Sequence, residues 1–143
     1  MIRSVLAILA GIVTLTAVSF GIEAIADVLL LKLFPASFPT QAALSHNVPA
    51  RVFEFTYGAM SVAAGAIVTA WLARRAPLRH AAAMGIVQAG LTLWAMSAMW
   101  NHAPAMTWIA SALMALPAAL LGGWLFIRHA SRRELQSSAS TSG

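Results

Sequence analysis

Long stretches without a charged side chain constrain this chain more than any other feature. Nineteen uncharged residues separate Arg3 from Glu23, and nineteen more separate Glu54 from Arg74. Forty-eight uncharged residues separate Arg79 from Arg128. A bilayer core about 30 Å thick needs about 20 apolar residues in a helix that rises about 1.5 Å per residue. Because a turn at 101–104 interrupts the longest stretch, the pattern predicts four transmembrane helices, at about 4–26, 52–73, 80–100 and 105–127.

Composition excludes the main alternatives to a membrane protein. Apolar residues make up 60% of the chain and charged residues only 9%, whereas a soluble domain has roughly a quarter of its residues charged. The chain has no cysteine, which excludes disulfide frameworks, thiolate zinc sites and iron–sulfur clusters. Its apolar runs lack the alternation of a barrel strand. We therefore expect an all-α integral membrane protein whose residues 1–134 form an antiparallel up-down bundle of four transmembrane helices.

Three segments need a separate interpretation. Residues 33–50 are uncharged but contain three prolines, which remove backbone donors and therefore predict an outer loop. Residues 135–143 are rich in serine, and we expect them to form a disordered tail. Residues 1–26 imitate a cleavable signal peptide that ends in Ala-Ile-Ala before Asp27. Cleavage there would leave three helices, and the sequence leaves this alternative open.

The basic residues are divided unequally between the two ends of the predicted bundle. If the chain crosses the membrane four times, two basic residues (Lys32 and Arg51) fall on one side, and the other seven lie on the side of both termini. These seven are Arg3, Arg74, Arg75, Arg79, Arg128, Arg132 and Arg133. Since basic residues near membrane ends are retained in the cytoplasm, the pattern predicts a bacterial inner-membrane protein with cytoplasmic N- and C-termini. The basic residues lie in three short flanks without stacking aromatics, so we expect the lipid bilayer as a partner and no nucleic acid.

Small residues recur at a spacing of four in three of the predicted helices, which lets helix backbones approach closely. They are Ser61 and Gly65, Gly85 and Ala89, and Ala115, Ala119 and Gly123. Each set keeps to one face because four residues advance about 400° around a helix. We interpret the sets as helix-packing faces. They suit dimerisation faces equally, and the sequence leaves both interpretations open.

The ionisable residues within the predicted helices gather near the outer boundary. Glu23 and Asp27 share a face of the first helix, while Arg51 and Glu54 lie three residues apart at the start of the second. One interpretation is an outward-facing vestibule for a cation or a cationic substrate, or a hard-metal site. The other, which the sequence favours, is ion pairing at the headgroup level that fixes the helix ends. The bilayer centre carries only uncharged polar side chains, which are Thr14, Ser61, Gln88, Thr92 and Ser111.

The sequence predicts no metal or cofactor site. Two histidines, His80 and His129, fall on the cytoplasmic side, and His46 and His102 fall on the other, whereas zinc needs three or four ligands that converge on one point. The chain has no Gly-rich phosphate loop, nucleophile elbow or His-Glu-x-x-His pattern. We therefore do not expect an enzyme.

One resemblance rests on Arg3 with Ala10-Gly11, on the hairpin 71–81 and on the segment 116–123. In these segments the chain resembles small, uncharacterised four-helix inner-membrane proteins of bacteria, which implies a topology but no activity. A fainter resemblance rests on Glu23 followed by Lys32. It is to small multidrug-resistance exporters, which have four helices and a functional glutamate in the first, and it implies such a role for Glu23.

Packing faces without a buried reactive group predict a non-enzymatic membrane protein. We expect a structural or accessory subunit with an unidentified membrane partner, or a small homo-oligomer. The alternative is a small transporter of cationic or lipophilic compounds that uses the outward-facing residues Glu23, Asp27 and Glu54. The sequence identifies neither a substrate nor a partner.

Overall fold

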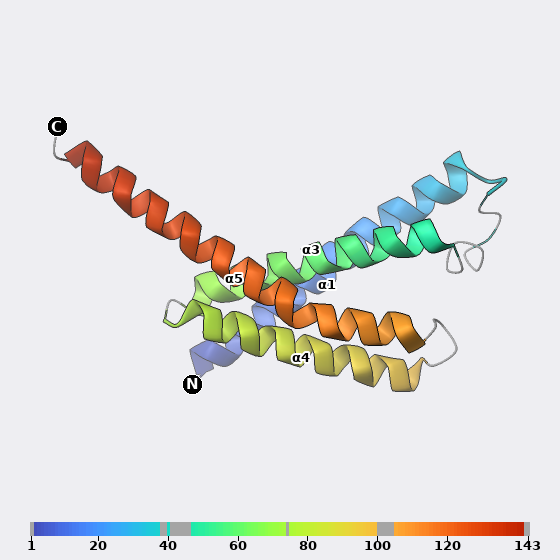
Figure 1. Cartoon of the computed structure of the whole chain (residues 1–143), viewed down its shortest axis with the longest axis horizontal. Helices are drawn as coiled ribbons and strands as arrows, with labels where there is room; N and C mark the ends of the chain where they lie inside the picture. The colour runs from blue at the N-terminus through green and yellow to red at the C-terminus, as the bar shows by residue number, and fades with distance from the viewer. Residues whose placement is uncertain (1, 38–39, 41–46, 74, 100–104, 142–143) are drawn as a thin grey trace.

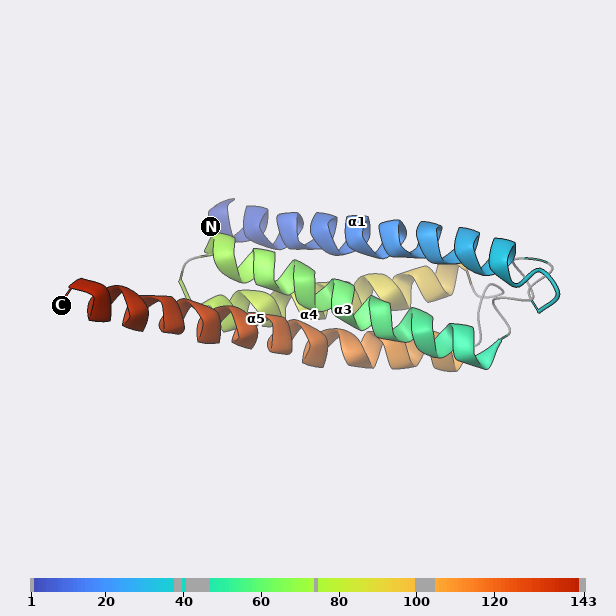
Figure 2. The ribbon, with the colours of Figure 1, turned by 90° about the horizontal axis from the view of Figure 1, so that it is seen from above.

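The computed structural model describes residues 2–37, 40, 47–73, 75–99 and 105–141. Within these ranges it forms four helices and no strand: α1 (Ile2–Leu33), α3 (Val48–Ala73), α4 (Pro77–Ala98) and α5 (Ala105–Thr141). Successive helices run in opposite directions, as Figures 1 and 2 show. The predicted all-α fold, an up-down bundle of four helices, is confirmed. We call the end that carries both termini the terminal end, and the end where α1 finishes and α3 begins the loop end.

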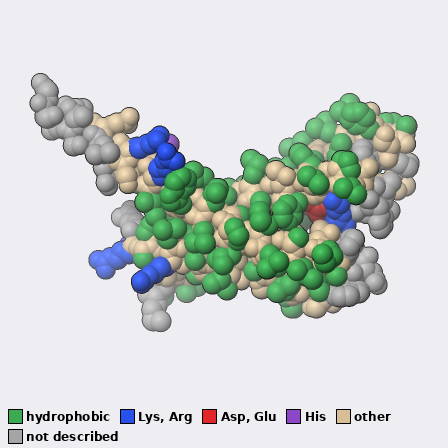
Figure 3. Space-filling model, viewed as in Figure 1, with side chains coloured by type: hydrophobic (Ala, Val, Ile, Leu, Met, Phe, Trp, Pro, Cys, Tyr) green, Lys and Arg blue, Asp and Glu red, His purple; other side chains and the backbone are tan. Residues whose placement is uncertain are grey.

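Each of the four helices is long and apolar enough to cross a membrane. The shortest is α4, with 22 residues, which span about 33 Å and so match the hydrocarbon core of a bilayer. Large apolar side chains cover the outward faces (Figure 3), among them Phe20, Trp94 and Leu113, each at least 65% exposed. Such a surface suits contact with lipid and would be a liability in water. The chain therefore fits a multi-pass integral membrane protein.

All four helices differ from their predicted ranges, and in α1 and α4 the prediction had placed an end next to a charged residue. α1 continues to Leu33 and does not end near residue 26, since no proline or glycine follows Gly21 before Pro35. α4 begins at Pro77 and not at residue 80, because proline suits the first turn of a helix. A charged side chain limits how far a helix enters lipid, but it does not stop the helix.

The predicted outer loop over 33–50 is shorter in the structure. α3 begins at Val48, and the backbone N–H of Ala50 donates to the Asn47 side chain at 3.1 Å. This hydrogen bond caps the helix, and Pro49 lies in the first turn, where its missing N–H has no helical partner to lose. The connection is therefore 34–47, of which 38–39 and 41–46 lie outside the described residues.

α5 departs furthest from the prediction. It continues to Thr141, whereas the sequence predicts a helix to residue 127 and a disordered tail over 135–143. No proline or glycine lies between Gly123 and Gly143, so no residue stops the helix where its side chains turn polar. The 37 residues of α5 span about 55 Å. Figures 1 and 2 accordingly show α5 extending past the other helices at the terminal end.

Small residues bring the helix backbones together in the terminal half of the bundle. α1 and α3 approach so closely that a Cβ atom added to Gly65 would lie 2.5 Å from the carbonyl oxygen of Gly11. α4 and α5 meet where a Cβ atom on Gly85 would lie 2.8 Å from the Cβ atom of Ala119. In a bilayer, where lipid is as apolar as leucine, close approach of this kind supplies the packing energy that holds helices together.

The predicted packing residues lie between helices of this one chain. The buried ones are Ser61, Gly65, Gly85, Ala115, Ala119 and Gly123, and Ala89 is half-buried. The buried hydroxyl of Ser61 donates to the carbonyl oxygen of Tyr57 one turn earlier, at 2.8 Å, so this polar group is satisfied within α3. The small-residue faces are therefore covered by neighbouring helices of the monomer.

The two helix pairs separate toward the loop end. Figure 1 shows α1 and α3 diverging there from α4 and α5. The buried residues of α1 are Ala7, Gly11 and Leu15, and those of α4 are Ala81, Met84 and Gly85. All six lie in the terminal half of their helices, so the close-packed core occupies that half and space remains between the pairs at the loop end.

Candidate functional site

The space between the two helix pairs holds a cavity of about 180 Å³ that all four helices line. Figure 3 shows a notch at the loop end in which acidic and basic side chains lie next to each other. Since a water takes about 30 Å³ of liquid volume, the cavity has room for several waters or one small solute. Leu15 and Val62 belong both to its lining and to the buried core, so the core closes the cavity on the side of the terminal end.

Three charged side chains line the cavity: Glu23 from α1, and Arg51 and Glu54 from α3. The Nη1 atom of Arg51 lies 3.3 Å from the Oε2 atom of Glu54, one turn along the same helix. The side chain of Glu54 is 50% exposed, so this ion pair contributes little stability. Two carboxylates and one guanidinium give the lining a formal charge of −1, which favours a cationic solute.

The uncharged polar side chains that α4 and α5 contribute to the cavity come in pairs four residues apart. Gln88 and Thr92 lie on α4, and Thr107 and Ser111 lie on α5. The Nε2 group of Gln88 donates to Oγ1 of Thr92 at 3.4 Å, and that hydroxyl donates to the carbonyl oxygen of Gln88 at 3.0 Å. Polar groups are costly inside a bilayer and face protein or water there, so these helices turn their polar faces to the cavity and their apolar faces to lipid.

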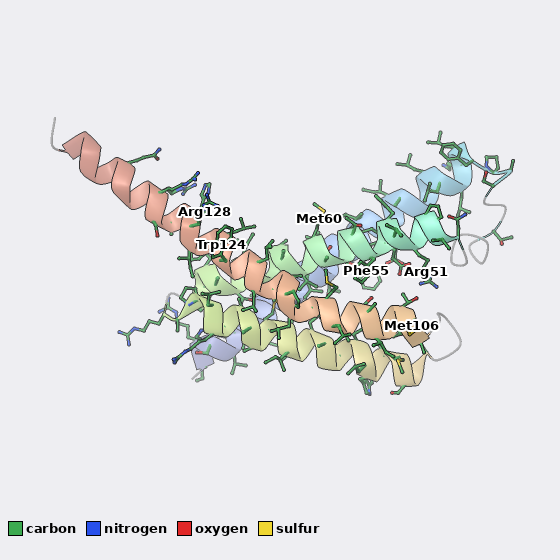
Figure 4. The ribbon with its side chains drawn as sticks, viewed as in Figure 1. Arg51, Phe55, Met60, Met106, Trp124 and Arg128 are labelled. Atoms are coloured by element: carbon green, nitrogen blue, oxygen red, sulfur yellow. The ribbon has the colours of Figure 1, made fainter. Side chains whose placement is uncertain are left out.

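Two aromatic side chains of α3, Phe55 and Tyr57, complete the lining on the α3 wall. In Figure 4, Phe55 and Arg51 project from α3 toward the α4–α5 pair. The ring of Tyr57 is buried, and it packs edge-on against Phe53 with 5.5 Å between ring centroids. Aromatic faces attract cations through their quadrupole, so the aromatic and acidic parts of the lining suit the same kind of solute.

The structure brings together three of the four residues predicted as an ionisable cluster. Glu23, Arg51 and Glu54 line one cavity, while Asp27 lies one turn beyond Glu23 on α1 and is not part of the lining. The predicted Arg51–Glu54 ion pair forms. The Arg51–Glu54 ion pair is therefore part of the lining of the cavity and does not exclude a vestibule there.

Sequence reasoning missed most of the uncharged lining. It named Gln88, Thr92 and Ser111 only as polar residues at mid-depth, and it did not single out Ser19 or Thr107. The signal that finds them is spacing, since Ser19 with Glu23, Gln88 with Thr92 and Thr107 with Ser111 are each four apart and share a helix face. A polar pair on one face of an otherwise apolar span indicates a face that turns away from lipid.

No group of three or more His, Asp or Glu side chains within the described ranges is arranged to hold a metal ion. His46 and His102 lie outside those ranges. A solute in the cavity would therefore face the carboxylates of Glu23 and Glu54 on the wall formed by α1 and α3. It would face hydroxyl and amide groups on the wall formed by α4 and α5.

Comparison of this chain with family models, with curated proteins and with solved structures finds no match. Its function is therefore inferred from its own residues and their geometry.

Proposed function

We propose that this protein is a small transporter of cationic or lipophilic compounds and is not an enzyme. We further propose that it lies in a bacterial inner membrane with both termini in the cytoplasm. The observation that carries the proposal is that Glu23 and the Arg51–Glu54 pair line one cavity, which all four helices build and the core closes on one side. A solute enters from the loop end, where the helix pairs diverge (Figure 1).

The chemistry of the lining supports a cation over other solutes. Its formal charge is −1, from Glu23, Glu54 and Arg51, and aromatic rings share the wall with the carboxylates. Since Arg51 already pairs with Glu54 at 3.3 Å, Glu23 on the neighbouring helix α1 is the carboxylate best placed to neutralise an incoming positive charge. Uncharged hydroxyl and amide groups on α4 and α5 replace part of the water that the solute leaves behind.

Uptake into liposomes tests this proposal on the unmodified chain. Proteoliposomes should accumulate radiolabelled tetraethylammonium faster than protein-free liposomes, and the excess rate should saturate with concentration. Tetraethylammonium should also raise the melting temperature of the detergent-purified protein relative to sodium chloride at equal ionic strength, because a ligand that binds only the folded state stabilises it. Equal uptake by both kinds of liposome, together with an unchanged melting temperature, would remove the support for transport.

The proposed orientation is supported by the distribution of arginine. Within the described residues, Arg3, Arg75, Arg79 and the arginines of α5 lie toward the terminal end, where Figure 3 shows blue side chains gathered, and Arg51 lies at the loop end. Basic residues mark the cytoplasmic side of an inner-membrane protein.

Because the chain contains no cysteine, single introduced thiols report this orientation directly. Ser37 and Arg75 are both exposed, at the loop end and the terminal end respectively. A membrane-impermeant maleimide added to intact cells should label Ser37→Cys and leave Arg75→Cys unlabelled, and both should react after permeabilisation. Labelling of Arg75→Cys alone in intact cells would show the inverse orientation.

A second candidate function is that of an accessory subunit. One observation favours it: the residues of α1 and α4 that are buried all lie in the terminal half, which leaves the loop-end halves of both helices without a fully buried residue. A neighbouring subunit would cover these faces. Extraction in mild detergent should then recover a stoichiometric partner or a defined homo-oligomer, whereas a monomer that carries only lipid and detergent counts against this function.

A further inference from the structure

A second hollow lies on the surface at the terminal end, away from the cavity. It is a groove of about 520 Å³ between α3 and α5. Its lining consists of Ile67 from α3 and of Leu125, Phe126, His129, Ala130 and Arg133 from α5. We call it the α3–α5 groove.

The groove arises where two helices that touch begin to separate. Gly122 of α5 lies so close to α3 that an added Cβ atom would overlap the carbonyl group of Ala63. One turn closer to the terminal end, Ile67 on α3 and Phe126 on α5 form the first walls of the groove. Figure 1 shows α5 leaving α3 beyond this point, so the groove widens toward the end of the bundle.

Its chemistry changes along its length. Phe126, His129, Ala130 and Arg133 follow one another at spacings that keep them on one face of α5. Phe126 lies nearest the bundle, and Arg133 lies furthest from it, about 10 Å further along the helix. An apolar trough that ends in two basic side chains matches the order of an acyl chain and a phosphate in a phospholipid.

The charges around the groove support an anionic occupant. The guanidinium carbon of Arg128 lies 5.1 Å from the centroid of the Trp124 ring, and tryptophan is typical of the headgroup level of a membrane protein. Arg132 lies beside Arg133 in the sequence, and the seven arginines of this end of the chain outnumber its one acidic residue, Glu134. Basic pockets between helices at this level are typical sites for anionic headgroups.

We propose that the α3–α5 groove binds one anionic phospholipid, with an acyl chain along Ile67 and Phe126 and the phosphate between His129 and Arg133. The site does not depend on the cavity at the loop end or on what that cavity transports. A bound lipid would extend the contact between α3 and α5 past their crossing point, where the protein alone leaves them apart.

Native mass spectrometry of the detergent-purified full chain tests the proposal, with dioleoylphosphatidylglycerol and dioleoylphosphatidylcholine as probes. We expect one phosphatidylglycerol to remain bound at concentrations where phosphatidylcholine does not. Arg133→Gln should weaken its retention about fivefold, since an arginine near an anionic surface contributes about 1 kcal/mol. Arg132→Gln is the matched control. It removes the same charge from the neighbouring residue, which does not line the groove, and it should change retention less than about twofold.

Two further measurements keep the outcome decisive. Ala130→Trp should fill the groove without changing any charge and should displace the lipid, while the melting temperature of the protein without added lipid stays within a few degrees of the unmodified value. Sodium phosphate in excess should not displace phosphatidylglycerol, because the apolar trough contributes to binding. Equal retention of both lipids, equal losses in Arg132→Gln and Arg133→Gln, or displacement by free phosphate would each overturn the proposal.

Discussion

Replacing Gly65 by alanine is expected to lower the free energy of unfolding by about 2 kcal/mol, within the range measured for overpacked cores. The added Cβ atom would lie 2.5 Å from the carbonyl oxygen of Gly11, 3.0 Å from the Cβ atom of Leu15 and 3.2 Å from the Cε atom of Met84. Met84 can move its terminal methyl group, but the Gly11 oxygen belongs to the backbone of α1. The helices therefore have to move apart.

Separation of α1 from α3 would affect the candidate site as well as stability. The contact is reciprocal, because a Cβ atom on Gly11 would lie 2.7 Å from the carbonyl oxygen of Gly65. Glu23 lies about three turns along α1 from this contact and forms one wall of the cavity, while Arg51 and Glu54 form another on α3. A shift at the glycines would displace these walls relative to each other, so Gly65→Ala should also weaken binding of the cationic probe.

Gly58→Ala is the matched control for stability, since it makes the same change two turns earlier in α3. A Cβ atom at Gly58 meets nothing within 4 Å, and alanine is the better helix former. The free energy of unfolding should therefore stay the same or rise slightly. Titration with sodium dodecyl sulfate, followed by circular dichroism, measures both variants. If the two variants lose equal stability, the close approach of α1 and α3 is not what holds them together.

The fold was predictable because the distances between charged residues along the sequence are its strongest constraint. A span of about 20 uncharged residues has few alternatives to a membrane helix, so α1, α3, α4 and α5 were each found. The end of α3 at Ala73 and the start of α5 at Ala105 were also found, but the other ends were displaced, because a charged residue does not by itself end a helix. α1 passes Glu23 and Asp27 without interruption and ends at Leu33, just before Pro35.

The packing was predictable in part. Gly65 and Gly85 were identified as packing positions from their spacing, but spacing does not say which helix each of them meets. The contacts of Gly65 with Gly11 and of Gly122 with Ala63 depend on how the helices cross. Neither Gly11 nor Gly122 belonged to a predicted helix-packing face. The small-residue faces could have formed a dimer, and only the tertiary structure shows them covered within one chain.

The candidate site was the least predictable part, because each of its polar residues has an ordinary explanation when taken alone. A threonine in a membrane helix can donate to the carbonyl oxygen one turn earlier, as Thr92 does to Gln88. Such a residue indicates a cavity only when three other helices turn polar residues toward it. That convergence is a property of the helix rotations, which no single helix encodes.

Replacing Glu23 by glutamine is expected to weaken binding of tetraethylammonium by about tenfold or more, which corresponds to about 1.4 kcal/mol. The change removes one negative charge and keeps the size of the side chain. The remaining charges of the lining are then those of Arg51 and Glu54, which lie 3.3 Å apart and neutralise each other. A cation entering the cavity would find no net charge to offset the loss of its hydration.

Asp27→Asn provides the control for Glu23→Gln. It removes the same charge from the same helix one turn closer to the loop end, at a position outside the cavity lining. If the lining itself recognises the cation, Asp27→Asn should reduce affinity less than about threefold, since a charge outside the cavity acts only through a screened field. Binding is measured as the shift in melting temperature with tetraethylammonium concentration, and both variants should melt within a few degrees of the unmodified protein when no ligand is present. Equal losses in the two variants would mean that the overall negative charge at the loop end attracts the cation, and that Glu23 has no distinct place in its recognition.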